Sequence, residues 1–348
     1  MAGTLASAVT LVWLGRVVDV FSVSKVAFWV CIALSLACAA MSVVSSIWML
    51  VAVIFGLRLF GQGMMSHIAM VAMGRWYVAE RGRAVSLTSM GYQIGSGIFP
   101  FVMVSLIGLI GWRLSWTLAA GMMIFVALPS IYVLMQKERI PRGQSNAVEE
   151  SGSQKQWTHA EVLADPLFWI MLTGVVAPSF IGTAVFFHQV HIGEIKGWSR
   201  ELIASSLAVA AVATVVFSLI SGWLIDRFSA RQVLPLFLFP LGIGNVLLGW
   251  FDGASIIIIF MLLHGVSHGV SNTLFGALWP EVYGTRHLGA VRSLIMAAMV
   301  IGSALGPGAT GWLIDLGVGF EIQLVAMGVY CLVTCVMMGM VSVALARR

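Results

Sequence analysis

One stretch of the chain decides its fold class: residues 202–225 read LIASSLAVAAVATVVFSLISGWLI and hold no charged side chain. About 20 consecutive apolar residues cross the hydrocarbon core of a bilayer as a helix. Similar stretches fill most of the remaining sequence. They are longer than the strands of about ten residues that build membrane barrels, and they do not alternate polar with apolar residues. Because helices satisfy their own backbone groups inside lipid, we expect an all-α membrane protein.

The composition of the chain excludes a soluble domain. Of its 348 residues, 60% are hydrophobic and only 9% are charged, whereas roughly a quarter of the residues of a soluble domain are charged. The net charge of +5 comes from residues that stand singly or in pairs at the ends of apolar stretches. Without a dense basic stripe, the chain is not expected to bind nucleic acid.

Hydropathy divides the sequence into about eleven (5+6) membrane-spanning helices. We expect them at residues 3–22, 26–44, 47–73, 84–110, 113–135, 167–192, 202–225, 232–251, 254–279, 288–314 and 320–346. They form an N-terminal half (residues 1–135) and a C-terminal half (residues 167–348), joined by a polar linker (residues 136–166). Within the linker, Thr158-His-Ala-Glu161 has the pattern of a capping box and predicts a short helix.

The distribution of basic residues predicts the orientation in the membrane. Fifteen of the 19 Lys and Arg residues, Arg292 among them, fall in one alternate set of connectors, while the other set holds only Arg113, Lys196 and Arg200. Cytoplasmic loops are enriched in Lys and Arg. We therefore expect a multi-pass protein of the plasma (inner) membrane, with a cytoplasmic linker, a cytoplasmic C-terminus and an N-terminus outside.

The two halves match at a constant offset of 207 residues, which indicates two parallel pseudo-repeats. The matched pairs are Gly15 with Gly222, Asp19 with Asp226, Gly82 with Gly289, Gly95 with Gly302, and Pro100 with Pro307. Parallel repeats build one large class of transporter folds, with the substrate held between them. At this offset, the partner of the helix at 167–192 would precede residue 1, so we expect the first half to lack its opening helix.

Several motifs resemble those of the major facilitator superfamily. Gly222-Trp-Leu-Ile-Asp226-Arg227, followed by Arg231, resembles the loop signature of the family, and Gly15-Arg-Val-Val-Asp19 is a weaker first-half copy with Val20 in the arginine position. Arg58-Leu-Phe-Gly61-Gln62-Gly63 is similar to the arginine motif of the family's fourth helix. The resemblance covers the whole chain, beginning at the family's second helix. It implies a major-facilitator-type helical bundle and secondary transport.

Two further segments are similar to the monocarboxylate and oxalate/formate branch of that superfamily. They are Phe187-His188-Gln189 and Trp279-Pro280-Glu281-Val-Tyr-Gly284. Oxalate-type carriers place basic residues in the eighth and eleventh family helices, whereas 202–225 and 288–314 carry none within their apolar bodies. A dianion such as oxalate is therefore not expected, and a monocarboxylate or another small organic anion is favoured.

The loop signature implies a conformational latch formed by Gly15, Asp19, Gly222, Asp226, Arg227 and Arg231. Gly15 and Gly222 would allow close backbone approach at a helix end. In the resembling family, such aspartates face the N-terminus of a helix from the other half, where the partial positive charge favours an anion. The alternative is a simple loop ion pair of Asp226 with Arg227 or Arg231.

Four side chains are candidates for substrate binding or coupling: Arg58, His188, His264 and His268. A charge deep in a span usually faces a cavity or a partner, so Arg58 either attracts an anionic substrate or holds neighbouring helices through backbone carbonyls. Histidine titrates near physiological pH, which suits proton coupling. The alternative for each histidine is a hydrogen-bonded packing role.

A glycine–proline stretch interrupts the tenth predicted helix. Gly302, Gly306 and Pro307 are expected to bend that helix or to let a neighbour approach closely. Exporters of the resembling family carry a similar motif in the fifth helix, where this chain has Phe99 before Pro100 instead of glycine. That difference weakens an export function.

These patterns favour a secondary active transporter that moves a small solute by alternating access. Its partners would be a small-molecule substrate, protons and membrane lipid, and we expect it to function as a monomer. No phosphate loop, metal set or nucleophile–base pair is present in the sequence, so neither a cofactor nor an enzyme is expected. Two alternatives stay open: an inactive or incomplete fragment of such a transporter, and an efflux carrier for amphipathic compounds.

Overall fold

The structure, a computed structural model, describes residues 2–135 and 155–348. Every regular element within these residues is a helix, and the helices account for the expected all-α class. Most of the predicted linker, residues 136–154, lies outside the described residues. The part of the linker that is described contains the short helix α9 (His159–Ala164), at the position of the capping-box pattern.

Ten helical segments of the described chain are long and apolar enough to cross a membrane. They are Gly3–Val20, Val23–Ser42, Ile47–Trp76, Arg81–Leu134, Pro166–Phe187, Arg200–Phe228, Ala230–Trp250, Ser255–Tyr283, Leu288–Asp315 and Phe320–Ala346. The fourth has 54 residues, about twice the length that one crossing needs. Gly111 divides it, with φ 79° and ψ 159°. Counted as two crossings, it gives the eleven helices expected from hydropathy.

The boundaries differ from those predicted where helices are interrupted. The first span consists of α1 (Ala2–Leu14) and α2 (Val17–Val20), separated at Gly15 and Arg16. The span predicted at 167–192 ends earlier, because α10 (Pro166–Phe187) is followed by the separate helix α11 (Gln189–Lys196). These breaks place polar groups at helix ends, where backbone groups lack intrahelical partners.

The chain separates into two compact units that do not coincide with the sequence halves. Of the described residues, the first unit comprises 2–78, 94–135, 155–159 and 283–297, and the second comprises 79–93, 160–282 and 298–348. The first turns of α16 (Leu288–Asp315) therefore belong to the first unit, and the first turns of α6 (Arg81–Met122) belong to the second. Each unit contains a helix N-terminus contributed by the other half of the sequence.

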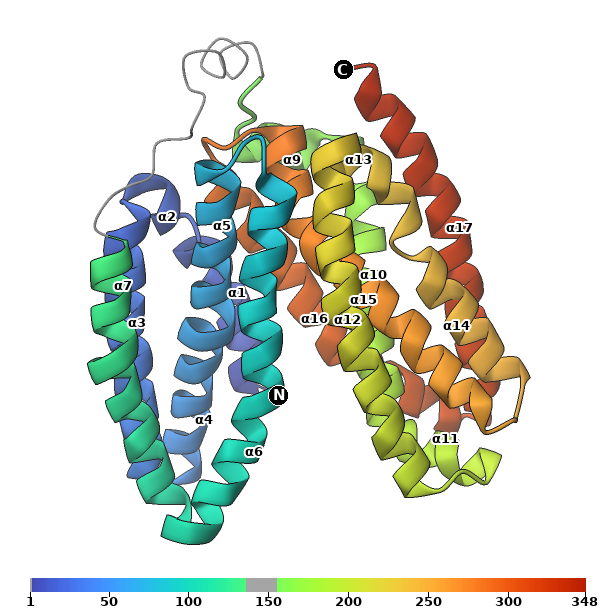
Figure 1. Cartoon of the computed structure of the whole chain (residues 1–348), viewed down its shortest axis with the longest axis horizontal. Coiled ribbons are helices and arrows are strands. Elements are labelled where there is room, and N and C mark those ends of the chain that lie inside the picture. Colours follow the sequence, from blue (N-terminus) through green and yellow to red (C-terminus); the bar gives the residue numbers. More distant parts are fainter. Residues whose placement is uncertain (1, 136–154) are drawn as a thin grey trace. The chain divides into compact units, whose positions relative to one another are not determined.

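The first unit contains the remaining helices of the N-terminal half. They are α3 (Val23–Ser42), α4 (Ile47–Gly56), the π-helical segment η1 (Leu57–Met65), α5 (Ser66–Trp76), the later part of α6, η2 (Met123–Ala127) and α7 (Leu128–Leu134). Helices α3 and α7 lie side by side (Figure 1). Val18, Met64, Ile68 and Val71 are buried in this unit. They belong to α2, η1 and α5.

The second unit is held by close approaches between helices of the C-terminal half. Besides α9, α10, α11 and part of α16, it contains α12 (Arg200–Phe228), α13 (Ala230–Val233), η3 (Leu234–Leu236), α14 (Phe239–Trp250), α15 (Ser255–Tyr283) and α17 (Phe320–Ala346). A Cβ added at Gly265 would lie 2.5 Å from the carbonyl oxygen of Ala210, and one at Gly269 would lie 2.5 Å from that of Thr214. Glycine thus lets α15 pack directly on the backbone of α12.

Candidate functional site

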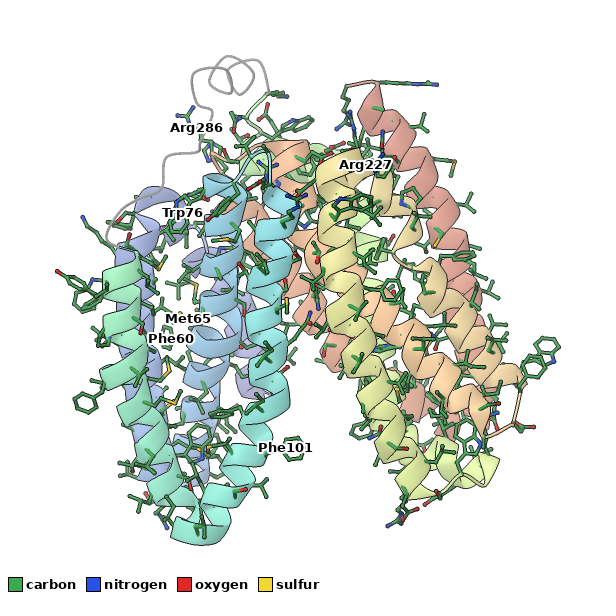
Figure 2. The ribbon with its side chains drawn as sticks, viewed as in Figure 1. Phe60, Met65, Trp76, Phe101, Arg227 and Arg286 are labelled. Carbon is green, nitrogen blue, oxygen red and sulfur yellow. The ribbon has the colours of Figure 1, made fainter. Side chains whose placement is uncertain are left out.

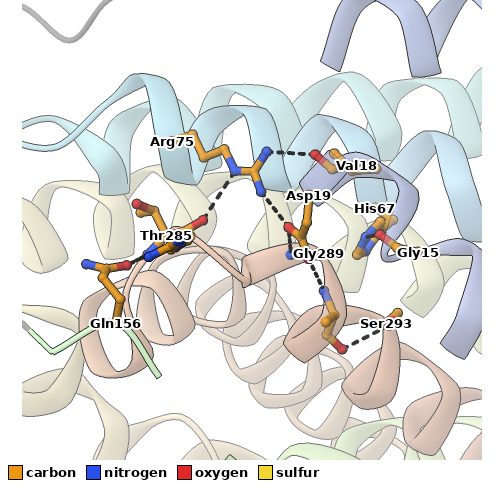
Figure 3. Close-up of polar contacts among 11 residues, drawn as sticks. Gly15, Val18, Asp19, His67, Arg75, Gln156, Thr285, Gly289 and Ser293 are labelled. Atoms are coloured by element: carbon orange, nitrogen blue, oxygen red, sulfur yellow. Dashed lines mark hydrogen bonds and ion pairs between the residues drawn. The ribbon is translucent and has the colours of Figure 1, made fainter. Parts of the chain in front are cut away.

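In the first unit, the carboxylate of Asp19 caps the N-terminus of α16 (Figure 3). Its Oδ1 accepts a hydrogen bond from the amide of Gly289 at 2.8 Å, and its Oδ2 accepts one from Ala290 at 2.8 Å. Arg75 Nη2 donates to Oδ1 at 2.5 Å. The first N–H groups of a helix lack intrahelical partners and carry a partial positive charge. The Asp19 carboxylate therefore provides both the missing hydrogen-bond acceptors and a compensating negative charge. Asp19, Arg75, Gly289 and Ala290 are called the Asp19 site below.

Glycines make this approach possible. A Cβ at Gly289 would lie 2.7 Å from Asp19 Oδ1, and a Cβ at Gly15 would overlap the side chain of Ser293. Ser293 Oγ donates to the carbonyl oxygen of Val12 at 3.2 Å, which joins α16 to α1 as well. Any larger residue at Gly15 or Gly289 would force α16 away from α1 and α2.

The second unit repeats this arrangement around Asp226, at the N-terminus of α6. Asp226 Oδ1 accepts from the amide of Gly82 at 2.6 Å, and Oδ2 accepts from the amide of Arg83 at 3.1 Å. The Arg83 Nε atom lies 3.6 Å from Oδ2. A Cβ at Gly222 would lie 2.6 Å from Ser86 Oγ. Asp226, Gly82, Arg83 and Gly222 form what is called the Asp226 site below.

The two aspartates and the helix N-termini that they cap match at the offset of 207. Gly82 and Arg83 occupy the positions of Gly289 and Ala290, and Ser86 occupies that of Ser293. The serine pair was missed in the sequence, although the constant offset would have revealed it. Serine is small enough to face a glycine across a close helix contact.

Arg227 and Arg231 have other contacts in the structure. Arg227 is labelled in Figure 2. Its guanidinium lies over the rings of Trp223, 5.3 Å from the centroid, and Phe228, 5.4 Å from the centroid. The amide of Arg231 donates to Glu281 Oε1 at 3.3 Å, and that of Ala230 donates to Oε2 at 2.8 Å. Glu281 therefore caps the short helix α13. The role of both arginines in a latch stays a prediction.

Arg75 is a polar partner that sequence reasoning missed. Its Nη1 donates to the carbonyl oxygen of Val18 at 2.8 Å and its Nε to that of Thr285 at 3.3 Å, besides the contact with Asp19 (Figure 3). Val20 replaces the arginine of the loop signature in the first half. Arg75, which lies on α5, places a positive charge beside Asp19, where the arginine of the loop signature is replaced by Val20. A partner 56 residues away leaves no local signal.

Two buried ionisable side chains lie near the same helix end. His67 is fully buried, and its Nε2 lies 3.1 Å from the carbonyl oxygen of Gly15. Arg292 was assigned to a connector from the sequence, but it lies inside α16 and is buried. Helix α16 begins at Leu288, as the predicted span does, so Arg292 occupies its second turn and is not part of the connector.

Arg58 lies on η1, and its side chain is exposed within the first unit. Its Nη1 donates to Gln62 Oε1, four residues along, at 2.5 Å. Figure 2 labels Phe60 and Met65 on the same segment. Gln62 is a partner that the quoted motif contained but that sequence reasoning did not single out. Because the side chain of Gln62 is neutral, this hydrogen bond does not neutralise the positive charge of Arg58.

The structure brings two of the three candidate histidines together. The rings of His264 and His268 stack at 5.9 Å with an interplanar angle of 18°. Phe186 of α10 meets the His264 ring edge-on at 5.0 Å. His268 Nδ1 lies 3.2 Å from Asn272 Nδ2. Asn272 extends the spacing of four residues along α15, and that spacing could have identified it.

His188 lies elsewhere in the second unit, at the junction of α10 and α11. Its Nε2 is 3.4 Å from the carbonyl oxygen of Pro307, and its ring is 5.0 Å from that of Phe320. These contacts are with α16 and α17. The packing alternative for His188 is consistent with them.

The glycines of α16 meet α10 at close range. A Cβ at Gly302 would lie 2.5 Å from Val176 Cγ1, and one at Gly306 would lie 2.5 Å from the carbonyl oxygen of Phe180. Thr183 Oγ1 donates to the carbonyl oxygen of Ser303 at 3.0 Å. Pro307 lies within the helix. The close approach is thus present, and a bend at Pro307 stays a prediction.

The described residues hold no cluster of three or more His, Cys, Asp or Glu side chains that could bind a metal ion. The polar groups instead form helix caps within apolar surroundings. Such a cap is reversible, because the helix N-terminus and the carboxylate separate without breaking a covalent bond. The arrangement can hold two helices together and release them.

Many transporter folds are all-helical membrane bundles built from internal repeats. The family model of the Major Facilitator Superfamily matches residues 1–199 and again residues 179–347. The chain therefore belongs to the Major Facilitator Superfamily, whose members are transporters and not enzymes.

Curated relatives and solved structures agree with this family. The chain is 23% identical over 268 residues to monocarboxylate transporter 13 of Rattus norvegicus, covering 76% of this chain and 60% of the relative. It is 22% identical over 255 residues to the oxalate:formate antiporter of Oxalobacter formigenes, covering 71% and 59%. The match thus spans about three fifths of the length of these two relatives.

Among solved structures, the E. coli fucose:proton symporter FucP has a TM-score of 0.74 at 12% identity, covering 98% of this chain and 90% of that one. The proton:xylose symporter XylE has a TM-score of 0.71 at 13% identity, covering 97% and 84%. At these identities the likeness shows the fold.

Proposed function

We propose that the chain is a secondary active transporter that moves a small organic anion by alternating access. In this proposal, the Asp19 and Asp226 sites are latches that hold one end of the bundle closed and open during each transport cycle. One observation carries the proposal: two aspartates 207 residues apart each accept two amide hydrogen bonds from a helix of the opposite sequence half.

The strength of these contacts suits a switch. A hydrogen bond to a charged group contributes roughly 1.5–3 kcal/mol, and a carboxylate at a helix N-terminus adds about 0.3–1 kcal/mol. The side chains of Asp19 and Asp226 are 10% and 11% exposed, so water competes only weakly. Moving a two-state equilibrium from 1:99 to 99:1 requires about 5.5 kcal/mol. Two such latches can therefore hold one state and still be opened by substrate binding.

The orientation follows from the bias of basic residues. Both latches would lie at the cytoplasmic end of the bundle, in the plasma (inner) membrane, with the linker and the C-terminus also cytoplasmic. Tight binding of a partner chain is not required for either latch, because each is complete within one chain. We propose that one chain in the lipid bilayer is the transporting form.

The substrate class is inferred from charge and from the named relatives. Arg58 offers an exposed guanidinium within a membrane span, which would attract a carboxylate. One relative is named as a monocarboxylate transporter and another as an oxalate:formate antiporter. The stacked pair His264 and His268 would carry the coupling proton, because an imidazole ring can bind and release a proton. We therefore propose transport of a monocarboxylate together with a proton.

Uptake into proteoliposomes tests the proposal. Radiolabelled formate, lactate and pyruvate are each added to vesicles that contain the full chain, with and without an inward proton gradient. We expect saturable uptake of at least one of them, stimulated by the gradient. Uptake of an amphipathic cation with no uptake of any carboxylate would replace the proposal with the efflux alternative.

A further inference from the structure

We propose that Gln156 is a positioning residue for the Asp19 latch: the end of the linker straps the loop between α15 and α16, and so sets how firmly the latch closes. This inference rests on the proposed function, because it assumes that the Asp19 site opens during the transport cycle. Its observations all lie in the first unit.

The side chain of Gln156 joins the linker to this loop. Its Oε1 accepts hydrogen bonds from the amides of Thr285, at 3.0 Å, and Arg286, at 3.1 Å (Figure 3). Gly284 has φ 82°, and a Cβ there would overlap the Gln156 amide group. A residue with a side chain at this position would therefore be strained and would push Gln156 away.

The neighbouring residue reinforces the strap. The amide of Trp157 donates to the carbonyl oxygen of Tyr283 at 3.1 Å, and the two rings meet edge-on at 5.5 Å. Lys155 Nζ lies 4.1 Å from the centroid of the Trp157 ring. The first described residues of the linker, 155–157, thus hold the loop through a backbone hydrogen bond, the Gln156 side-chain amide and a ring contact.

The same loop is part of the Asp19 site. The carbonyl oxygen of Thr285 accepts from Arg75 Nε at 3.3 Å, and another nitrogen of Arg75 contacts Asp19 (Figure 3). The loop ends where α16 begins, at Leu288, and the next two amides are the ones that Asp19 accepts. Gln156 therefore holds one end of a short segment whose other end is the capped helix N-terminus.

Position matters for such a cap because hydrogen bonds weaken steeply with misalignment. Loss of the Gln156 acceptor would free the amides of Thr285 and Arg286 and let the loop shift. Arg75 and the α16 N-terminus would then move relative to the Asp19 carboxylate. The strap thus gives the linker control over one latch.

The Asp226 site offers an internal comparison. The loop before α6, residues 77–80, is tied at its end by Glu80, whose Oε1 lies 3.8 Å from Arg83 Nη1. That pair is exposed, and such pairs contribute little. A change at Gln156 is therefore expected to act on the Asp19 site and to spare the Asp226 site.

Thiol labelling of the full chain in proteoliposomes tests the strap. Ser293 and Ser86 are buried beside the two sites, so the thiol of Ser293→Cys or Ser86→Cys reacts with a maleimide only when its latch opens. Labelling of the four native cysteines, which are buried or half-buried, is subtracted. Gln156→Leu removes the acceptor and leaves an apolar side chain one bond shorter, whereas Gln156→Glu keeps both the length and the acceptor.

We expect Gln156→Leu to raise labelling of the Ser293→Cys thiol by about 3- to 10-fold, with less than a twofold change for Ser86→Cys. Gln156→Glu should label no faster than the unsubstituted chain. Equal labelling of Gln156→Leu and Gln156→Glu, or equal increases at both reporter thiols, would overturn the strap.

Asp19→Asn separates this inference from the proposed function. If Asp19→Asn raises labelling of Ser293→Cys and Gln156→Leu does not, the strap is wrong and the latch stands. If neither raises it, the latch itself is wrong. Hydrogen exchange of the Gly289 and Ala290 amides, followed in the chain with native serines, gives the same comparison should the reporter substitution disturb folding.

Discussion

Removal of the charge at Asp226 is the sharpest perturbation of the Asp226 site. Asp226→Asn keeps the size of the side chain, but its amide group has one acceptor atom where the carboxylate has two. One of the two amides, that of Gly82 or that of Arg83, must then face an NH₂ group. The variant therefore loses a charge-assisted hydrogen bond and the favourable charge at the N-terminus of α6.

The magnitude follows from these two losses. The hydrogen bond contributes roughly 1.5–3 kcal/mol, and the charge at the helix end about 0.3–1 kcal/mol. The ion pair with Arg83, 3.6 Å long and on a half-exposed arginine, adds little. The latch is then weakened by about 2–4 kcal/mol, which is roughly a 30- to 1000-fold change in its opening equilibrium.

Hydrogen exchange of the Gly82 and Arg83 amides measures this equilibrium, because exchange of a capped amide requires opening. We expect these amides to exchange about 30- to 1000-fold faster in Asp226→Asn, with α15 and α17 unchanged. Asp252→Asn is the matched control, since it removes an 81% exposed carboxylate from an ion pair with Lys196. Exchange at Gly82 and Arg83 within twofold of the unsubstituted chain would refute the capping role of Asp226.

Three further perturbations test other parts of the account. Gly222→Ala places a methyl group against Ser86 and should lower the free energy of unfolding by about 1–3 kcal/mol. Thermal unfolding measures this loss. Gly91→Ala is the control, because a Cβ added there meets nothing within 4 Å. Arg58→Ala should abolish carboxylate uptake in a folded protein while Arg58→Lys keeps part of it, and normal uptake by Arg58→Ala would limit Arg58 to packing. His268→Gln should keep uptake driven by a substrate gradient and lose its stimulation by protons; retained stimulation would exclude the His264–His268 pair from coupling, and His191→Gln serves as the control.

The fold could be predicted because its determinants can be read from the sequence without knowledge of side-chain contacts. Apolar runs such as 202–225 give the spans, and the constant offset relates Asp19 to Asp226 and Gly82 to Gly289 before any contact is known. Hydropathy also separated the two crossings on either side of Gly111. The predicted helix ends were less accurate. For example, hydropathy gave no sign of the break between α10 and α11, because apolar residues continue on both sides of it.

The composition of the sites was only partly predictable. The two aspartates and their facing glycines follow from the repeat, but Arg75, Ser293 and Gln156 reach the Asp19 site from distant segments, and no periodicity connects them. The histidines show the same limit. Spacing along one helix correctly joined His264 to His268, whereas His188 could be placed beside Pro307 and Phe320 only by packing.

Counterflow tests the central claim of alternating access most directly. Proteoliposomes containing the full chain are loaded with a high concentration of an unlabelled carboxylate that the chain transports and are diluted into a trace of the same compound in labelled form. A carrier whose site faces one side at a time should accumulate the label transiently above its external concentration. Simple equilibration of the label, with no overshoot, would contradict alternating access.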